Sequence, residues 1–165
     1  MKQTTPVKHL RDDLRAQGIA IPMEQYAFMF FVPINTPSSK NSKNIVTNFK
    51  TKRPMLISNK LTQDYKKATG IVYQAEKSRF RKATEHLVKP LMVEFEFLRD
   101  SNRHFDLINA AQIVQDMMVE HELLDDDDYT NVIPYFVPPK VLKNHPGVWV
   151  RVIDTSKFKP NFKKI

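Results

Sequence analysis

The stretch from Arg103 to Asp128 holds the densest group of side chains that could do chemistry. A basic lead-in precedes Asp106, a helix-like segment follows, and four consecutive aspartates, Asp125 to Asp128, end the stretch. Adjacent carboxylates repel one another, and each raises the cost of ionising its neighbour. A hard cation such as Mg²⁺ prefers oxygen ligands, and binding it between Asp106 and one or two of the later aspartates would remove that cost. The alternative is an acidic, solvated turn between a helix and a strand, which is the usual state of an acidic run.

The composition predicts one soluble domain. A chain of 165 residues that is 41% hydrophobic has the length of one domain and can bury a core. It has no cysteine, which excludes disulfides and thiolate–zinc sites. No apolar run reaches the roughly 18–20 residues of a membrane span, and the polar start has no signal-peptide core. We therefore expect no membrane contact and a cytoplasmic location.

The charge of the chain indicates a polyanionic partner. The formal net charge is +8 and the pI is near 9.6, which points first to nucleic acid. The segment from Pro33 to Pro54 is rich in Pro, Ser and Asn, which predicts a long loop or a ragged hairpin. It is interpreted either as a flap that binds backbone phosphates or as a solvated surface loop. Its basic residues, with no acidic residue between them, are Lys40, Lys43, Lys50, Lys52 and Arg53.

Hydrophobic periodicity predicts a long helix between two strands in the first half of the chain. Apolar residues 26–32 and the alternating residues 91–98 are typical of strands. In the second strand Val93, Phe95 and Phe97 face one way, while Glu94 and Glu96 face water or the active centre. The helix spans roughly residues 59–81. Its expected buried stripe is Leu61, Tyr65, Ala68, Val72 and Ala75.

The second half of the chain predicts one more helix and two more strands. The helix runs from Asp106 to Val119, with the carboxylate at its dipole-favoured start. Strands are expected at 131–137 and 148–153. The order of elements indicates an α/β (α+β) fold, a small mixed β-sheet flanked by helices. We divide the chain into an N-terminal accessory helix (1–25), a main domain (26–153) and a basic C-terminal tail (154–165).

The order and spacing of these motifs resemble the RusA-type Holliday junction resolvases. In that family a basic run precedes Asp-x-Asp-Asn, a helix carries Lys and then Asp, and Asp-Asp follows after a turn and a loop. Residues 37–41 (PSSKN) resemble its Pro- and Asn-containing loop, and residues 56–58 (LIS) resemble its second landmark. The resemblance covers roughly residues 26 to 153. The central motif corresponds here to Arg103-His104-Phe105-Asp106-Leu107-Ile108-Asn109, then Asp116, then Asp126-Asp127.

The resemblance implies a metal-dependent, structure-selective DNA endonuclease that resolves Holliday junctions or other branched DNA in recombination, replication and repair. It also implies a homodimer, because a four-way junction has two symmetric cut sites. The location that it implies is a bacterial or phage-infected cell. Asp106, Asp126 and Asp127 would be the catalytic residues and the ligands of Mg²⁺ or Mn²⁺, which would activate water and stabilise charge on the scissile phosphate. The expected DNA-binding residues are Lys40, Lys43, Lys50, Lys52, Arg53 and Arg103.

Two departures from the family pattern keep a second hypothesis open. Ile108 stands where the family has its second aspartate, and Gln112 stands where it has the helix lysine. Isoleucine cannot bind a metal, so Asp126, Asp128 or Glu96 would have to compensate, or cleavage would be weakened or lost. The alternative is a non-catalytic protein that binds branched DNA on the same fold. A third hypothesis is an unrelated RNA- or protein-binding module whose aspartates form a solvated turn.

Overall fold

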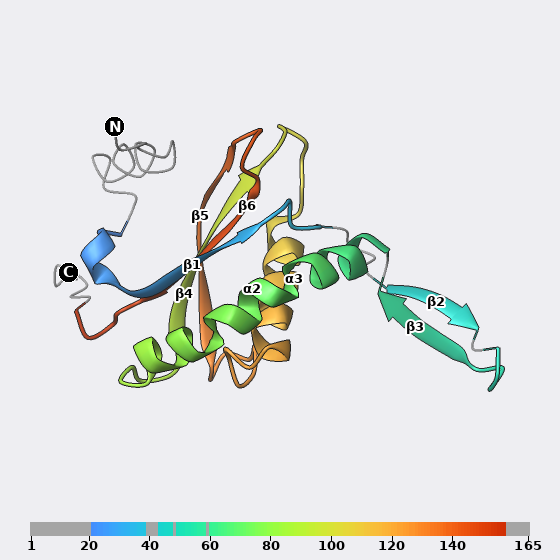
Figure 1. Cartoon of the computed structure of the whole chain (residues 1–165), viewed down its shortest axis with the longest axis horizontal. Helices are drawn as coiled ribbons and strands as arrows, with labels where there is room; N and C mark the ends of the chain where they lie inside the picture. The colour runs from blue at the N-terminus through green and yellow to red at the C-terminus, as the bar shows by residue number, and fades with distance from the viewer. Residues whose placement is uncertain (1–20, 39–42, 48, 59, 158–165) are drawn as a thin grey trace, which may run out of the picture.

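The computed structural model describes residues 21–38, 43–47, 49–58 and 60–157, with only the backbone described for 43–46 and 54–58. In this part of the chain a four-stranded sheet has the strand order β1-β6-β4-β5 (Figure 1). β4 and β5 are parallel and the other neighbours are antiparallel. This mixed sheet with two helices confirms the predicted α+β architecture. The elements are η1 (Met23–Gln25), β1 (Tyr26–Pro33), β2 (Lys43–Thr47), β3 (Pro54–Ser58), α2 (Lys60–Thr84), β4 (Leu91–Arg99), α3 (Leu107–Glu120), β5 (Val132–Val141) and β6 (Gly147–Ile153).

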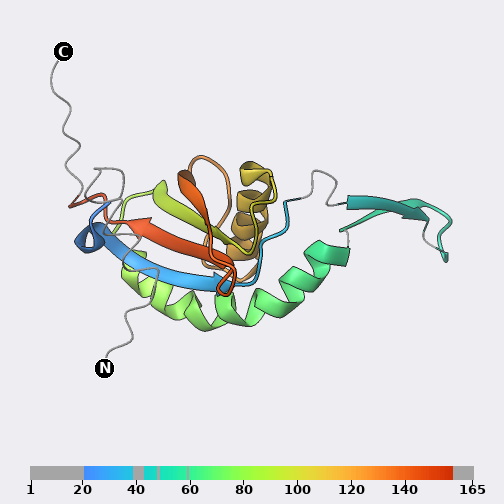
Figure 2. The ribbon, with the colours of Figure 1, turned by 90° about the horizontal axis from the view of Figure 1, so that it is seen from above.

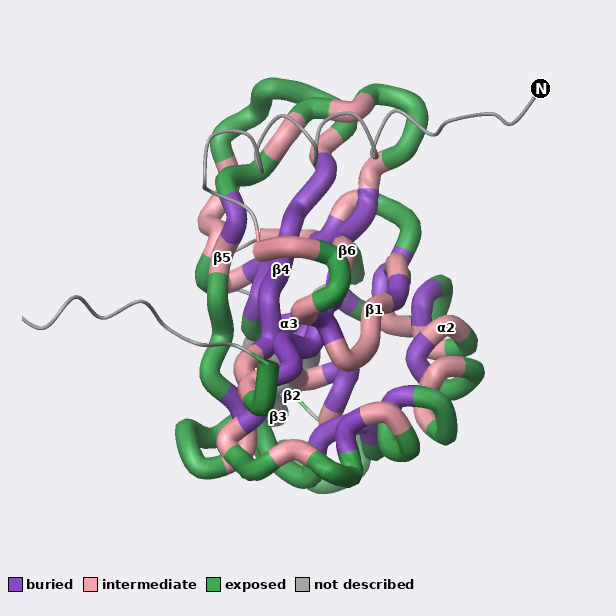
Figure 3. The backbone as a smooth tube through the Cα atoms, turned by 90° about the vertical axis from the view of Figure 1, so that its left-hand side faces the viewer, coloured by how far each residue is buried: buried purple, intermediate pink, exposed green. Residues whose placement is uncertain are grey.

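One face of the sheet and both helices share a single hydrophobic core. Val93, Phe95 and Phe97 of β4 are fully buried in it, as their alternation predicts. β6 contributes every second residue in the same way, because Phe95 pairs with Val150 in the antiparallel register. In Figure 3 buried residues run along β4 and β6, whereas the edge strand β5 carries many exposed ones. The core is therefore centred on the two inner strands.

The buried face of α2 differs from the predicted stripe. Tyr65 is buried as expected, but Leu61 is 68% exposed, and residues 68 and 75 are also exposed. Tyr73 and Phe80 are fully buried instead, and their rings lie edge-on to Phe30 and Phe28 of β1. Ring area outweighs the small aliphatic residues in deciding which face turns inward. The helix also continues through Gly70, whose missing side chain leaves room for His121 at the end of α3.

The second face of the sheet buries an ion-pair network. Arg151 of β6 is 1% exposed and donates to Glu94 at 2.6 Å and to Glu96 on β4. Tyr26 donates to Glu94 at 2.5 Å, and Lys140 of β5 donates to Glu96 at 3.0 Å. Both glutamates were expected to face water or the active centre, and this was wrong. They are buried because one arginine and two neighbouring donors compensate their charge.

The segment between β1 and α2, expected as a loop or a ragged hairpin, contains the hairpin β2–β3, which forms a separate two-stranded sheet. β5 is longer than predicted and runs on through Pro138 and Pro139, which an edge strand tolerates. Among the described residues no helix combines the length and hydrophobicity needed to cross a membrane. The proposed accessory helix lies mostly outside the described residues, as does the tail beyond residue 157.

Removing the central arginine should destabilise the protein strongly. Arg151→Ala leaves Glu94 and Glu96 buried without their main counter-charge, so we expect a loss of about 3–5 kcal/mol in the free energy of unfolding. Urea denaturation measures this loss. The matched control is Arg79→Ala, because Arg79 is 69% exposed and pairs with Glu76 on the surface of α2, where such pairs contribute about 0–1 kcal/mol. Equal losses in the two variants would contradict the assignment.

The same network predicts a loss of stability in acid. Burial raises the pKa of Glu96, but the charge of Arg151 and hydrogen bonds from Arg151 and Lys140 outweigh burial, so the pKa lies below its usual value of 4.5. The unfolded chain therefore binds a proton more readily than the folded protein does. The stability that Glu96 contributes is present above pH 4.5 and is lost as the pH falls through its lowered folded pKa. Denaturation at pH 7 and at acidic pH, compared with Glu96→Gln, measures this dependence. A variant with the same acid dependence as the natural chain would refute this role of Glu96.

Candidate nucleic-acid interface

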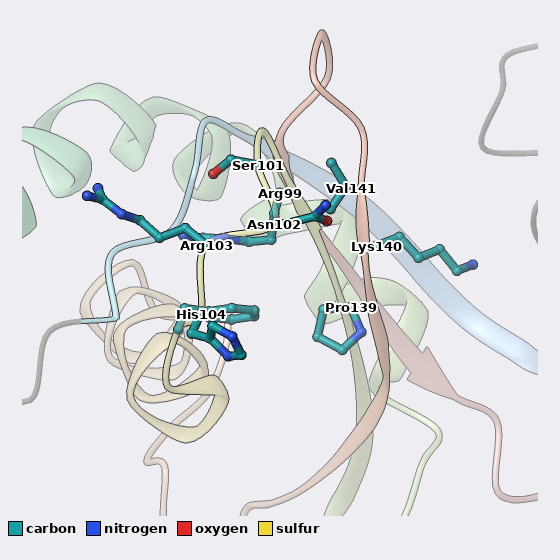
Figure 4. A pocket seen from close by; sticks show the side chains of 9 residues that line it. Arg99, Ser101, Asn102, Arg103, His104, Pro139, Lys140 and Val141 are labelled. Carbon is teal, nitrogen blue, oxygen red and sulfur yellow. The ribbon is translucent and has the colours of Figure 1, made fainter.

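A basic hollow lies where β4 and β5 end. Because the two strands are parallel, their carboxyl ends meet at one edge of the sheet, and α3 begins beside them. The loop from β4 to α3 and the last residues of β5 line this hollow, which has a volume of about 280 Å³. Figure 4 shows Arg103 and Lys140 extending outward in opposite directions from the hollow. The lining residues are Arg99, Ser101, Asn102, Arg103, His104, Phe105, Pro139, Lys140 and Val141.

Arg99 is held in place from two sides. Its Nη1 donates to the carbonyl of Thr36 at 2.7 Å, and its guanidinium lies 4.4 Å from the centre of the Phe105 ring. Phe105 in turn packs edge-on against Phe97 of the core. Burial lowers the pKa of Arg99, although nearby Asp100 raises it, and an arginine remains charged in any case. Its buried Nε has no protein partner. The guanidinium of Arg99 is thus a cation held in a fixed position beside the hollow.

The other cations of the hollow differ in what they can still bind. Lys140 is 14% exposed and pairs with Glu96, so its charge mainly compensates that buried carboxylate. Arg103 and His104 are exposed. Arg103 was predicted as a DNA-binding residue, and its position at the rim is compatible with that role. Sequence reasoning missed Arg99 and Lys140, because nothing local distinguishes a strand-end cation that faces a hollow.

Asp106 caps α3. Its Oδ1 accepts a hydrogen bond from the backbone N–H of Asn109 at 3.2 Å, which satisfies one of the free donors of the first turn. The Asn109 side-chain nitrogen is buried without a protein partner. Ile108, at the position of the family's second aspartate, is 61% exposed, and Gln112 one turn later is exposed as well. Asp106 therefore has a structural role, and it lies directly beside the basic loop.

The four consecutive aspartates have different environments. Asp125 accepts from Lys89 and pairs with Arg81 at 2.8 Å, and the hydrogen bond from Lys89, followed by that from Arg81, lowers its pKa. Asp128 accepts from the backbone and side chains of residues 130 and 131, and these bonds lower its pKa. Asp126 accepts only from the N–H of Asp127 among the interactions described. All four aspartates are exposed, and the outer two stabilise the turn through these bonds.

Within one chain the predicted metal ligands lie at opposite ends of α3. Asp127 shares a second hollow, of about 240 Å³, with Asp116, Val119 and Glu120. Asp116 is ten residues after Asp106, which corresponds to about 15 Å along a helix axis, whereas two ligands of one Mg²⁺ lie within about 4 Å of each other. No group of three or more acidic or histidine side chains in the described ranges could hold a metal. Asp106 does not fit a single-chain metal site shared with Asp126 and Asp127.

The remaining predicted DNA-binding residues belong to the β2–β3 hairpin and its approach. Lys50, Lys52 and Arg53 lie exposed in the turn of the hairpin. Lys43 begins β2, and only its backbone is described. Lys40 lies outside the described residues.

The comparisons with protein-family models and with curated proteins find no match to this chain. The site therefore has to be interpreted from its own chemistry.

The cap predicts that two substitutions of Asp106 have different effects on stability. Asp106→Ala removes the acceptor and should cost about 0.5–2 kcal/mol of unfolding free energy, whereas Asp106→Asn keeps a good cap and should cost much less. Thermal or urea denaturation distinguishes them. If Asn destabilised as much as Ala, the carboxylate charge, not the capping oxygen, would be what the helix needs. Asp106→Asn is thus the variant with which to test the charge of this residue.

Proposed function

We propose that this chain binds the sugar–phosphate backbone of branched DNA. The observation that carries the proposal is the basic hollow beside the start of α3, where the guanidinium of Arg99 is held in place and Arg103 projects from the rim. Arginine side chains and helix starts are the groups with which proteins hold phosphates. The hollow is open and carries the basic side chains Arg99, Arg103 and Lys140, which suits a polymer backbone better than an enclosed small molecule.

The distribution of charge supports a nucleic acid over a small anion. No carboxylate side chain occurs between Glu24 and Asp64, a segment that contains the β2–β3 hairpin. The segment after β1, which precedes the hairpin in the chain, is tied to the hollow through the bond from Arg99 to Thr36. Two basic surfaces are thus connected at one edge of the sheet. The resemblance to RusA-type resolvases is the reason for choosing branched DNA over RNA.

The hollow predicts a measurable salt dependence. Arg103→Ala should weaken binding to a labelled four-way DNA junction and reduce the slope of log K against log salt by about 1, because one phosphate contact is lost. Titrations at several salt concentrations measure the slope. The control is Lys77→Ala, since Glu122 already neutralises this lysine. An unchanged slope for Arg103→Ala would remove the rim of the hollow from the interface.

A second candidate function is metal-dependent cleavage of that DNA. It is favoured by the position of Asp106, three residues after Arg103 and beside the proposed phosphate site. Mg²⁺ is commonly bound by one or two carboxylates together with substrate phosphates. Asp106 would supply such a carboxylate, and the metal would supply Lewis-acid stabilisation of phosphate charge. Asp126 and Asp127 lie at the other end of α3, so they would have to act at a separate place or from a second copy of the chain.

Cleavage of an end-labelled junction with Mg²⁺ or Mn²⁺ distinguishes the two candidates. The natural chain is compared with Asp106→Asn, which keeps the helix cap, and with Asp127→Asn. Symmetric nicks that disappear in Asp106→Asn would establish the endonuclease, and their loss in Asp127→Asn would bring the second hollow into the reaction. Tight junction binding without nicks in either metal would leave the binding function alone.

A further inference from the structure

The β2–β3 hairpin is an arm that extends from the body of the protein. Its two strands pair with each other in a sheet of their own, separate from the four-stranded one. Figures 1 and 2 show from two directions that it projects beyond the start of α2, the end at Lys60. A single two-stranded hairpin is at best marginally stable in water. Packing against the surface of a partner would stabilise such an arm.

The tip of the arm combines one aromatic ring with several cations. Phe49 is 87% exposed, the highest value among the large hydrophobic side chains in the described part of the chain. Lys50, Lys52 and Arg53 are exposed in the same turn. An isolated exposed hydrophobic residue is ordinary, but a ring surrounded by cations, in a segment with no carboxylate between Glu24 and Asp64, has the chemistry of a nucleic-acid contact.

The arm begins at the edge of the sheet that holds the basic hollow. β1 and β4 both run antiparallel to β6, so their carboxyl ends lie at the same edge. Arg99 at the end of β4 donates to the carbonyl of Thr36, three residues after the end of β1. The N–H of Asp100 donates to the Asn35 side chain at 3.3 Å. These bonds hold the segment that follows β1, and that leads toward the arm, against the loop that lines the hollow.

We propose that the arm reaches a DNA branch point and that Phe49 stacks there on a base, while Lys50, Lys52 and Arg53 contact the adjoining phosphates. A two-stranded ribbon fits a DNA groove, and apolar side chains at such positions act as wedges between bases. In a continuous duplex a wedge must first unstack two base pairs. A branch point already presents an incompletely stacked base, so the same contact costs less there. The inference rests on the proposed DNA binding and names the substrate feature that is recognised.

The test compares a four-way DNA junction with a continuous duplex of the same arm sequence, using the full chain. Phe49→Ala should lower the affinity for the junction by about 5- to 150-fold, the usual value of one base–aromatic stack, and lower that for the duplex by less than about 2-fold. The matched control is Tyr129→Ala, because Tyr129 is 82% exposed in the loop after α3. This control should bind both DNAs as the natural chain does.

A fluorescence measurement adds direct evidence for stacking. The natural chain has one tryptophan, Trp149, so Phe49→Trp adds an emission that can be obtained by subtraction. Stacking on a base should quench the added emission with the junction and leave it largely unchanged with the duplex. Quenching that is equal with both DNAs, or absent with both, overturns the branch-point contact.

The outcomes also separate this inference from the proposed function. If the natural chain binds the junction in a salt-dependent way and Phe49→Ala binds it equally well, the stacking contact is refuted and DNA binding stands. If the natural chain binds neither DNA at low salt, both proposals fail. If Phe49→Ala changes the sedimentation behaviour of the protein without DNA, the arm contacts a second copy of the chain and the inference is overturned.

Discussion

The parallel pairing of β4 with β5 is the constraint on which the candidate site depends. Parallel neighbours need a crossover, and α3 provides it by running back across the sheet. The start of α3 therefore lies at the carboxyl ends of the strands, beside the basic hollow and Asp106. The end of α3 lies at the opposite edge of the sheet, where Asp116 and Asp127 share the second hollow. A motif that is continuous in sequence is thus divided between two ends of the domain.

The structure also determines which charges can reach a partner. Several cations are engaged inside the chain: Arg151 and Lys140 compensate the two buried glutamates, and Asp125 engages Lys89 together with Arg81. The net charge of +8 is consequently a poor guide to the interface. What distinguishes the arm and the loop before α3 is the arrangement of exposed cations at one edge of the sheet. This local excess of exposed cations supports a polyanionic partner more strongly than the net charge of the chain does.

The sequence predicts local features well and long-range ones poorly. Alternation correctly assigned the core face of β4, and the position of Asp106 correctly marked the start of α3, because both patterns are set by neighbours in the chain. The burial of Glu94 and Glu96 could not be predicted, since Arg151 lies 57 and 55 residues away. The stripe predicted on α2 was right for Tyr65 and Val72 and wrong for Leu61, Ala68 and Ala75. The reason is the same, because the rings of β1 decide which residues of the helix turn inward. The role of Asp125 likewise depends on Arg81 and Lys89, which are distant in sequence.

The two basic surfaces are separated by the length of the arm. Each strand of the arm has five residues, which corresponds to about 17 Å of extended chain. The tip carrying Phe49 is therefore several base-pair steps of about 3.4 Å each from the other end of the arm. On the proposed substrate the hollow and the tip would contact different segments of the DNA. At a branch point such segments diverge from a common centre, where the proposed stacking of Phe49 would meet an incompletely stacked base.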